Sequence, residues 1–186
     1  ERLVVAELIA DVVTASENYF DDFNNGLFVD PRAVIVAEDG RSFLAASPEK
    51  FDLVISDLFV PWRSGVGSLY TVEHYLNVRG SLEIEGLFMQ WLPAYQLSFR
   101  EFGSIVRTML HVFPQITLWR GDFSSRRPVL GLLAGNIRKP LQPDAMLFST
   151  AAPKRIGREV PVLSHYIGNM GLLSDAFEGF PVNHED

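Results

Sequence analysis

Three acidic side chains follow three short apolar segments, each at a place where a strand would end. Glu7 lies near the end of the first segment, Asp39 just beyond the second, and Asp57 at the end of the third. In an open α/β sheet ligands bind outside the carboxyl ends of the strands, so parallel strands would present these carboxylates along one rim. A carboxylate there can accept both hydroxyl protons of a ribose diol. Asp39 can also accept a hydrogen bond from an exocyclic amine, with Gly40 letting the backbone approach the ligand.

A structural alternative stands beside this interpretation. Each acid would then cap a helix or mark a turn and touch no ligand. Trp62 lies in a polar loop that follows the third acid, where we expect it to form a wall against a substrate. Its alternative is an ordinary place in the core.

Composition excludes several other kinds of site. The chain has no cysteine, which removes disulfides, thiolate nucleophiles and Cys-ligated zinc. Its 23 acidic residues exceed its 16 Lys and Arg, and the net charge of −7 argues against a duplex-DNA binder and suits a cationic substrate. The four histidines lack metal-ligand spacing, so we predict no metal. Residues 65–68 match neither a dinucleotide-binding fingerprint nor a nucleophile elbow.

The elements that must position these residues alternate between strands and helices. Strands are predicted at residues 3–8, 33–37, 51–57, 87–92, 116–120 and 128–134. Helices are predicted at residues 10–20, 41–46, 71–82 and 98–112. Ser98 followed by Glu101 is a capping box at the start of the last helix. Residues 59–69 form a long loop rich in Pro, Gly and Ser.

This alternation predicts an α/β fold, with a mostly parallel sheet and helices on both faces. We expect a catalytic core over residues 3–136 and an irregular, partly helical extension over residues 137–186, where prolines interrupt the periodicity. The longest run without charged residues, 160–174, is too short and too polar to span a bilayer.

Several motifs resemble the aminopropyltransferases of the spermidine synthase family, in the order VVAEL (4–8), EDGRSF (38–43) and FDLVISD (51–57). The segment SLYTVEHY (68–75) is similar to the one after that family's catalytic loop. GLFMQWL (86–92), WRGDF (119–123) and PVNHED (181–186) resemble a branch in which the domain is often fused behind membrane helices. The resemblance covers roughly residues 3–134 and is loose beyond them.

The resemblance implies a Rossmann-like, methyltransferase-type fold and a role for each matched residue. Glu7 would bind the ribose hydroxyls of decarboxylated S-adenosylmethionine, and Asp39 with Gly40 the adenine. Asp57 would help deprotonate the attacking amine of a di- or polyamine. Tyr70 or Tyr75 would line the amine channel.

Four departures from the family pattern set further expectations. Val60 stands where a second Asp usually precedes the proline of the catalytic loop, and Ile9 replaces an acid common near Glu7. The first strand with its Gly-rich loop, and an N-terminal β-rich segment, have no counterpart here. We therefore expect a fragment that begins at the second strand of the fold, and that is inactive without the remainder.

Two alternatives to an aminopropyltransferase stay open at this point. One is a methyltransferase that uses intact S-adenosylmethionine, which the loss of the acid at Val60 favours. The other is a synthase-like domain that binds a nucleoside or an amine without catalysis. We also predict a homodimer. The predicted location is cytoplasmic, as a separate protein or as the cytoplasmic domain of a membrane protein.

Overall fold

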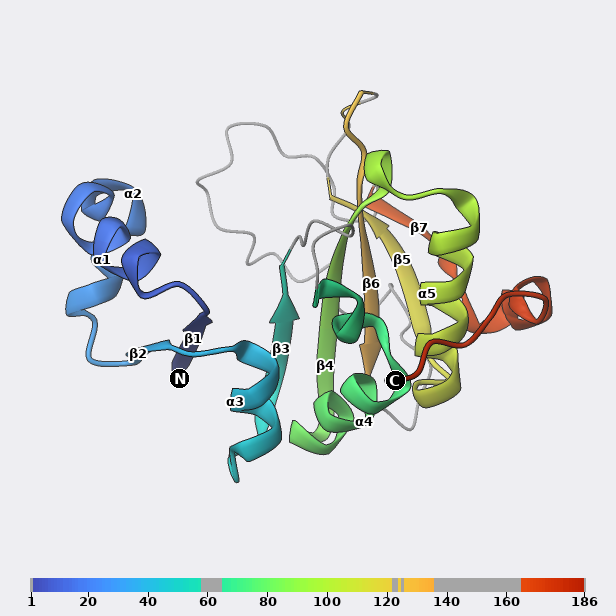
Figure 1. The fold of residues 1–186 in the computed structure, drawn as a ribbon, viewed down its shortest axis with the longest axis horizontal. Coiled ribbons are helices and arrows are strands. Elements are labelled where there is room, and N and C mark those ends of the chain that lie inside the picture. Colours follow the sequence, from blue (N-terminus) through green and yellow to red (C-terminus); the bar gives the residue numbers. More distant parts are fainter. Residues whose placement is uncertain (1, 58–64, 122–123, 125, 136–164, 186) are drawn as a thin grey trace, which may run out of the picture. The chain divides into compact units, whose positions relative to one another are not determined.

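The computed structural model describes residues 2–57, 65–121, 124, 126–135 and 165–185 of the chain (Figure 1). The chain divides into two compact units, Glu1–Pro48 and Glu49–Asp186. Both units contain strands and helices in alternation, which confirms the α/β class predicted from the sequence.

The first unit is built on two parallel strands. Its elements are β1 (Leu3–Glu7), α1 (Ala10–Tyr19), α2 (Asp21–Asn24), the 3-10 turn η1 (Leu27–Val29), β2 (Ala33–Ala37) and α3 (Gly40–Ala46). Strands β1 and β2 pair in register, from Leu3 opposite Ala33 to Glu7 opposite Ala37. Helix α1 contacts both strands and α3 contacts β1. The predicted strands and helices of this region are confirmed, and α2 and η1 are additional short turns.

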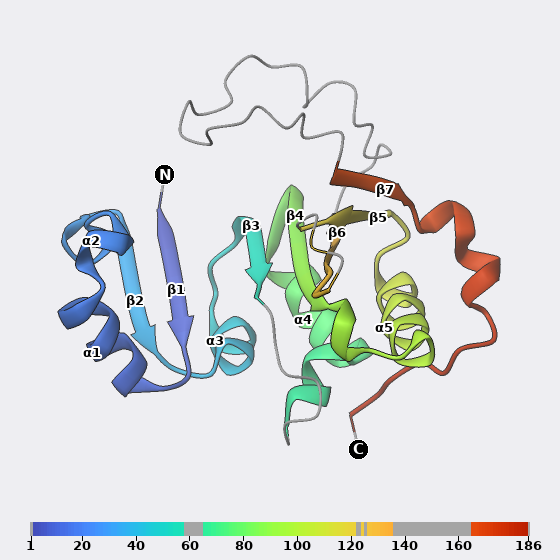
Figure 2. The same cartoon turned by 90° about the horizontal axis from the view of Figure 1, so that it is seen from above.

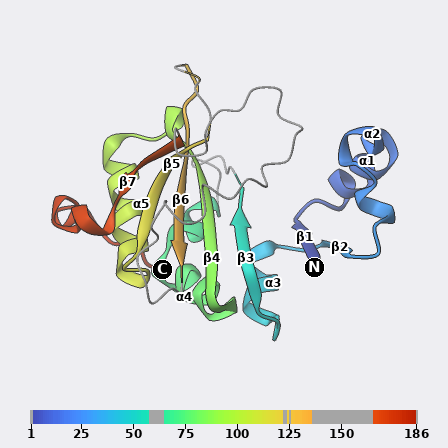
Figure 3. The same cartoon turned by 180° about the vertical axis from the view of Figure 1, so that it is seen from behind.

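The second unit contains a larger sheet. Its elements are β3 (Phe51–Ser56), the 3-10 turn η2 (Val66–Tyr70), α4 (Val72–Ser81), β4 (Leu82–Pro93), η3 (Ala94–Gln96), α5 (Phe99–Val112), β5 (Ile116–Arg120), β6 (Val129–Gly135), β7 (Tyr166–Asn169) and η5 (Gly171–Phe177). Figure 3 shows the strand order β3-β4-β6-β5-β7. The capping box at Ser98 and Glu101 is present at the start of α5, as predicted.

This second sheet is mixed, which corrects the expectation of a mostly parallel one. Only β3 and β4 pair in parallel among its described strands, whereas β4 with β6, β5 with β6 and β5 with β7 are antiparallel. The physical reason is the connection between β5 and β6. A parallel crossover needs a dozen or more residues, and the segment 121–128 is too short for one.

Helices α4 and α5 pack together on one face of this sheet (Figure 2). The side chains of Phe88, Gln90 and Leu92 alternate along β4 and are fully buried. Phe88 lies 6.1 Å, between ring centroids, from both Tyr75 of α4 and Phe113 at the end of α5. The core of the second unit therefore lies between β4 and the two helices.

Strand β4 is longer than its apolar pattern predicts, because it starts directly after α4 rather than at residue 87. Its pairing with β3 shifts register between Phe51 and Leu53. Gly86 is required beside this irregularity, since an added Cβ would meet the Phe51 carbonyl oxygen at 2.9 Å. Strand β7 was not predicted, because four residues are too few to show a period.

Candidate active site

Glu7 and Asp39 lie at the carboxyl ends of the two parallel strands of the first unit. Glu7 is the last residue of β1, and Asp39 follows the last residue of β2 by two positions. The Oε1 atom of Glu7 accepts a hydrogen bond from the amide of Ile9 at 2.9 Å. The Oδ1 atom of Asp39 accepts one from the amide of Ser42 at 2.8 Å and so caps α3.

Asp39 therefore caps a helix, as the structural alternative predicts. Glu7 makes a similar local contact, because its carboxylate accepts a hydrogen bond from an amide two residues later. Capping uses only one oxygen of each carboxylate. Within the part of the chain that the structure describes, the second oxygen of each has no hydrogen-bond partner. Both side chains are half-buried. Each acid thus keeps an acceptor that local structure does not use, as a ligand contact requires.

Gly40 is the first residue of α3 and lies close to β1. An added Cβ would touch the Cβ of Ala6 at 3.8 Å, which is ordinary van der Waals contact. Neither space nor a positive φ angle demands glycine here in the described chain. A ligand that approaches the backbone would supply a reason for it.

Asp57 belongs to the second unit and directly follows the last residue of β3. Its side chain is exposed. The residue before it, Ser56, is the register partner of Gln90 on β4. Two other residues of the sequence argument, Trp62 and Val60, lie outside the described residues.

A buried hydrogen-bonded pair lies beside this end of β3. The hydroxyl of Tyr75 on α4 donates to Oε1 of Gln90 at 2.7 Å, and both side chains are fully buried. Nε2 of Gln90 donates to the carbonyl oxygen of Leu69 on η2 at 3.5 Å. Burial raises the pKa of Tyr75 well above its ordinary value, with a further contribution from Tyr70. The phenol of Tyr75 is therefore neutral and committed to the protein interior.

Tyr70 differs from Tyr75 in one respect that matters for chemistry. Its side chain is 4 % exposed, and its hydroxyl has no hydrogen-bond partner among the described residues. Burial raises the pKa of this phenol to about 12, so the group is protonated at neutral pH. A buried hydroxyl without a partner is uncommon, because such groups usually form a hydrogen bond with the protein, with a water molecule or with a ligand.

Sequence reasoning assigned no role to Gln90, although the residue interrupts the otherwise apolar segment 87–92. A glutamine in such a run is the signal of a buried, hydrogen-bonded amide. Neither its partner Tyr75, 15 positions earlier, nor Leu69 could be identified from periodicity.

Residues 1–119 match the spermine/spermidine synthase domain, which is well over half of the chain. The chain belongs to the spermine/spermidine synthase family. The resemblance found in the sequence motifs is thereby confirmed.

Curated relatives in this family are polyamine aminopropyltransferases. The one from Pyrobaculum neutrophilum is 27 % identical over 181 residues, covering 94 % of this chain and 61 % of its own length. The one from Sodalis glossinidius is 33 % identical over 120 residues, covering 64 % of this chain and 42 % of its own. The chain therefore spans less than two thirds of the length of these relatives.

Solved structures of the family share the fold. A probable spermidine synthase from Corynebacterium glutamicum aligns with a TM-score of 0.70 at 21 % identity, over 100 % of this chain and 64 % of its own. A spermidine synthase in complex with the transition-state analogue AdoDATO aligns with a TM-score of 0.69 at 20 % identity, over 90 % of this chain and 56 % of its own. These alignments confirm the Rossmann-like, methyltransferase-type fold.

A metal-binding cluster and a membrane-spanning helix are both absent from the described ranges. These ranges hold no group of three or more His, Cys, Asp or Glu side chains that could bind a metal ion. No helix within them combines the length and the apolar character that a bilayer crossing needs.

Proposed function

We propose that the full-length protein is a polyamine aminopropyltransferase, which transfers an aminopropyl group from decarboxylated S-adenosylmethionine to a di- or polyamine. The observation that carries this proposal is the match of residues 1–119 to the spermine/spermidine synthase domain. The acids at the carboxyl ends of β1, β2 and β3 support it, because Glu7 ends β1, Asp39 follows the last residue of β2 by two positions and Asp57 directly follows β3, where the family motifs place a carboxylate.

In this proposal Glu7 and Asp39 bind the nucleoside. The open oxygen of Glu7 accepts hydrogen bonds from the ribose hydroxyls, and that of Asp39 accepts one from the adenine amino group. Gly40 lets the adenine edge approach the backbone. The spermidine synthase with AdoDATO supports a ligand of this chemical class.

Asp57 acts on the amine. A polyamine nitrogen is protonated at neutral pH and cannot attack until it loses a proton, which a neighbouring carboxylate can accept. The nitrogen then forms a bond to the carbon beside the sulfonium while the carbon–sulfur bond breaks, and methylthioadenosine leaves with the electron pair. Because the sulfonium is already an activated leaving group, orientation of the two substrates supplies most of the remaining catalysis.

Tyr70, Tyr75 and Trp62 remain the proposed residues of the amine side. The unpartnered hydroxyl of Tyr70 favours it over Tyr75 as the polar contact, since the hydroxyl of Tyr75 is already bound to Gln90. A homodimer and a cytoplasmic location stay predictions.

The test of this function is release of methylthioadenosine by the full-length protein from decarboxylated S-adenosylmethionine, with and without a panel of diamines. We expect release that depends on the amine. Asp57→Asn should lower it about 100-fold or more, because a positioned general base contributes at least that much. Binding of methylthioadenosine by the variant should stay within about twofold of wild type.

Asp52→Asn is the matched control, since Asp52 is an exposed acid of the same strand. It should leave transfer unchanged. Equal loss of transfer and nucleoside binding in Asp57→Asn would make Asp57 a structural residue. Absence of amine-dependent release by wild type, with the nucleoside still bound, would replace the proposed activity by methyl transfer or by binding alone.

A further inference from the structure

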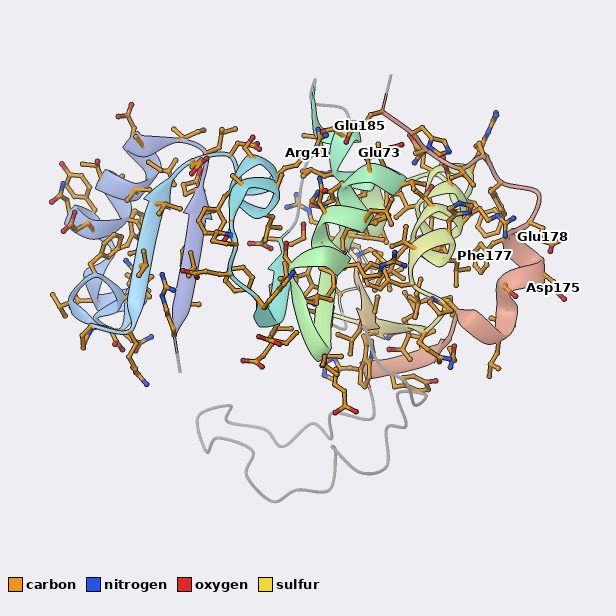
Figure 4. All side chains as sticks on the ribbon, turned by 90° about the horizontal axis from the view of Figure 1, so that it is seen from below. Arg41, Glu73, Asp175, Phe177, Glu178 and Glu185 are labelled. Carbon is orange, nitrogen blue, oxygen red and sulfur yellow. The ribbon has the colours of Figure 1, made fainter. Side chains whose placement is uncertain are left out.

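The segment of residues 181–185, here called the strap, is hydrogen-bonded to three elements of the second unit. It contacts η2, the start of α4 and the middle of α5 through hydrogen bonds that span 75 or more positions along the chain. In Figure 4, Glu185 of the strap lies beside Glu73 of α4. A segment without regular secondary structure is thus held in one place by specific polar contacts.

Asn183 is the centre of the strap, because all four of its polar groups are used. Its amide donates to Thr108 Oγ1 at 3.0 Å, and its carbonyl oxygen accepts from the Val72 amide at 3.0 Å. Its side-chain Oδ1 accepts from Ser104 Oγ at 2.8 Å. Its Nδ2 donates to the carbonyl oxygen of Tyr70 at 3.3 Å. One half-buried side chain therefore ties α5 to the last residue of η2.

Neighbouring strap residues hold the first turn of α4 in the same way. Nδ1 of His184 lies 3.0 Å from Glu73 Oε1, and the amide of Glu185 donates to Glu73 Oε2 at 3.0 Å. The hydrogen bond from His184 holds the pKa of Glu73 below its usual value. Both oxygens of this carboxylate are engaged by the strap.

Through Asn183 the strap also holds η2, the 3-10 turn that carries Tyr70. η2 is also held by Gln90, which bonds to the Leu69 carbonyl oxygen and lies in register with Ser56, the residue before Asp57. Two successive carbonyl groups of η2, at Leu69 and Tyr70, thus accept hydrogen bonds from two distant amide side chains. The backbone that carries the unpartnered Tyr70 hydroxyl is thus held by both side chains.

We propose that Asn183 is a positioning residue for the amine substrate: it fixes η2 so that the Tyr70 hydroxyl meets a nitrogen of the polyamine. A neutral phenol can accept a hydrogen bond from an ammonium group or donate one to a free amine. This inference rests on the proposed function. It assigns to the strap a role in recognition of the amine and none in binding of the nucleoside.

The test uses Asn183→Asp and Asn183→Ala in the full-length protein. Aspartate keeps the acceptor for Ser104 but turns an oxygen toward the Tyr70 carbonyl, so the one bond to η2 is lost selectively. For both variants the KM for the amine should rise about 3- to 10-fold, the range expected for one lost hydrogen bond. The KM for decarboxylated S-adenosylmethionine should stay within about twofold. Asn169→Ala is the matched control, because Asn169 also bonds through its side chain, to the Gly171 amide, but away from η2.

Tyr70→Phe makes the test specific, since it removes only the hydroxyl. If Asn183 acts through Tyr70, Asn183→Ala should add no further increase in the KM for the amine in the Tyr70→Phe background. Independent and additive increases would overturn the proposed route. Equal increases in both KM values, or a loss confined to kcat, would overturn the role in amine recognition.

Hydrogen exchange separates this inference from the proposed function. The Val72 amide donates a hydrogen bond to the strap, so its hydrogen should exchange about 10-fold faster or more in both Asn183 variants. In Asn169→Ala it should exchange at the wild-type rate. Unchanged exchange at Val72 would overturn the claim that the strap fixes the segment from η2 to the start of α4. If wild type transferred no aminopropyl group while Val72 exchange still rose, the proposed function and the role of Asn183 in amine recognition would both fall, and only the structural claim would stand.

Discussion

The two units of the chain contain the same kinds of secondary structure but differ strongly in how many of their side chains are buried. In the second unit Phe88, Met109 and Phe113 belong to a continuous core that is closed to solvent. In the first unit no described residue is buried, and Phe23 is 80 % exposed. The contrast follows from strand number, because two strands cannot enclose a core whereas five strands with two helices can.

The proposed contacts to the nucleoside and to the amine are therefore held in place by different kinds of interaction. Glu7 and Asp39 are placed by turns a few residues long, so their geometry depends little on packing. Tyr70 is placed by Gln90 and Asn183, which are distant in the chain. Mutations in the core should therefore disturb the amine side, and mutations in local turns the nucleoside side.

The largest expected effect contrasts two phenylalanines. Phe88→Ala should lower the free energy of unfolding by about 3–5 kcal/mol, because it leaves a cavity between Tyr75 and Phe113. Phe23→Ala should change it by less than about 0.5 kcal/mol, since little apolar surface is lost. Urea denaturation followed by far-ultraviolet circular dichroism measures both, because both units contain helices. Similar losses for the two variants would mean that Phe23 is covered in the full-length protein.

An intermediate effect is expected at Asp39, where a cap and a proposed ligand contact share one side chain. Asp39→Ala should weaken methylthioadenosine binding by about 1–3 kcal/mol and also lose the cap of α3. Asp39→Ser restores the cap but is too short to offer a second oxygen, so it should recover stability without recovering binding. Calorimetric titration and thermal melting separate the two. Binding at the wild-type level by Asp39→Ser would leave Asp39 as a cap alone.

The smallest effect concerns the pH dependence of the strap. Since its hydrogen bond with His184 lowers the pKa of Glu73 in the folded state, Glu73 stabilises the fold above its ordinary pKa of 4.5. That contribution is lost as the pH falls through the lower, folded value. The Tm difference between wild type and Glu73→Gln should therefore be present at pH 5 and shrink as the pH falls below about 4.5.

Glu83→Gln, which changes an exposed acid of β4, serves as the control and should show no such dependence. A Tm difference for Glu73→Gln that grew as the pH fell below about 4.5 would contradict the strap contact.

Much of the fold was predictable because its signals are local. The apolar run before Glu7 and the capping box at Ser98 and Glu101 are each contained within a few residues. Strand β7 and the start of β4 were not predicted, because neither segment shows a hydrophobic periodicity of its own. The antiparallel pairing of β5 with β6 was signalled by the short connection between them, although the apolar pattern alone favours a parallel sheet.

The candidate site divides along the same line. Residue types and spacing were sufficient to predict that Glu7, Asp39 and Asp57 lie at or just after strand ends, because a carboxylate after a strand is a local pattern and the family motifs are contiguous. The bond between Tyr75 and Gln90, and that between Asn183 and Tyr70 across 113 positions, arise only when strands and helices pack. Side-chain periodicity reports which face of an element is buried and carries no information about the distant partner that meets it there. The local sequence was thus enough to predict where the acids lie along the strands. Only packing determines which tyrosine hydroxyl has no hydrogen-bond partner among the described residues.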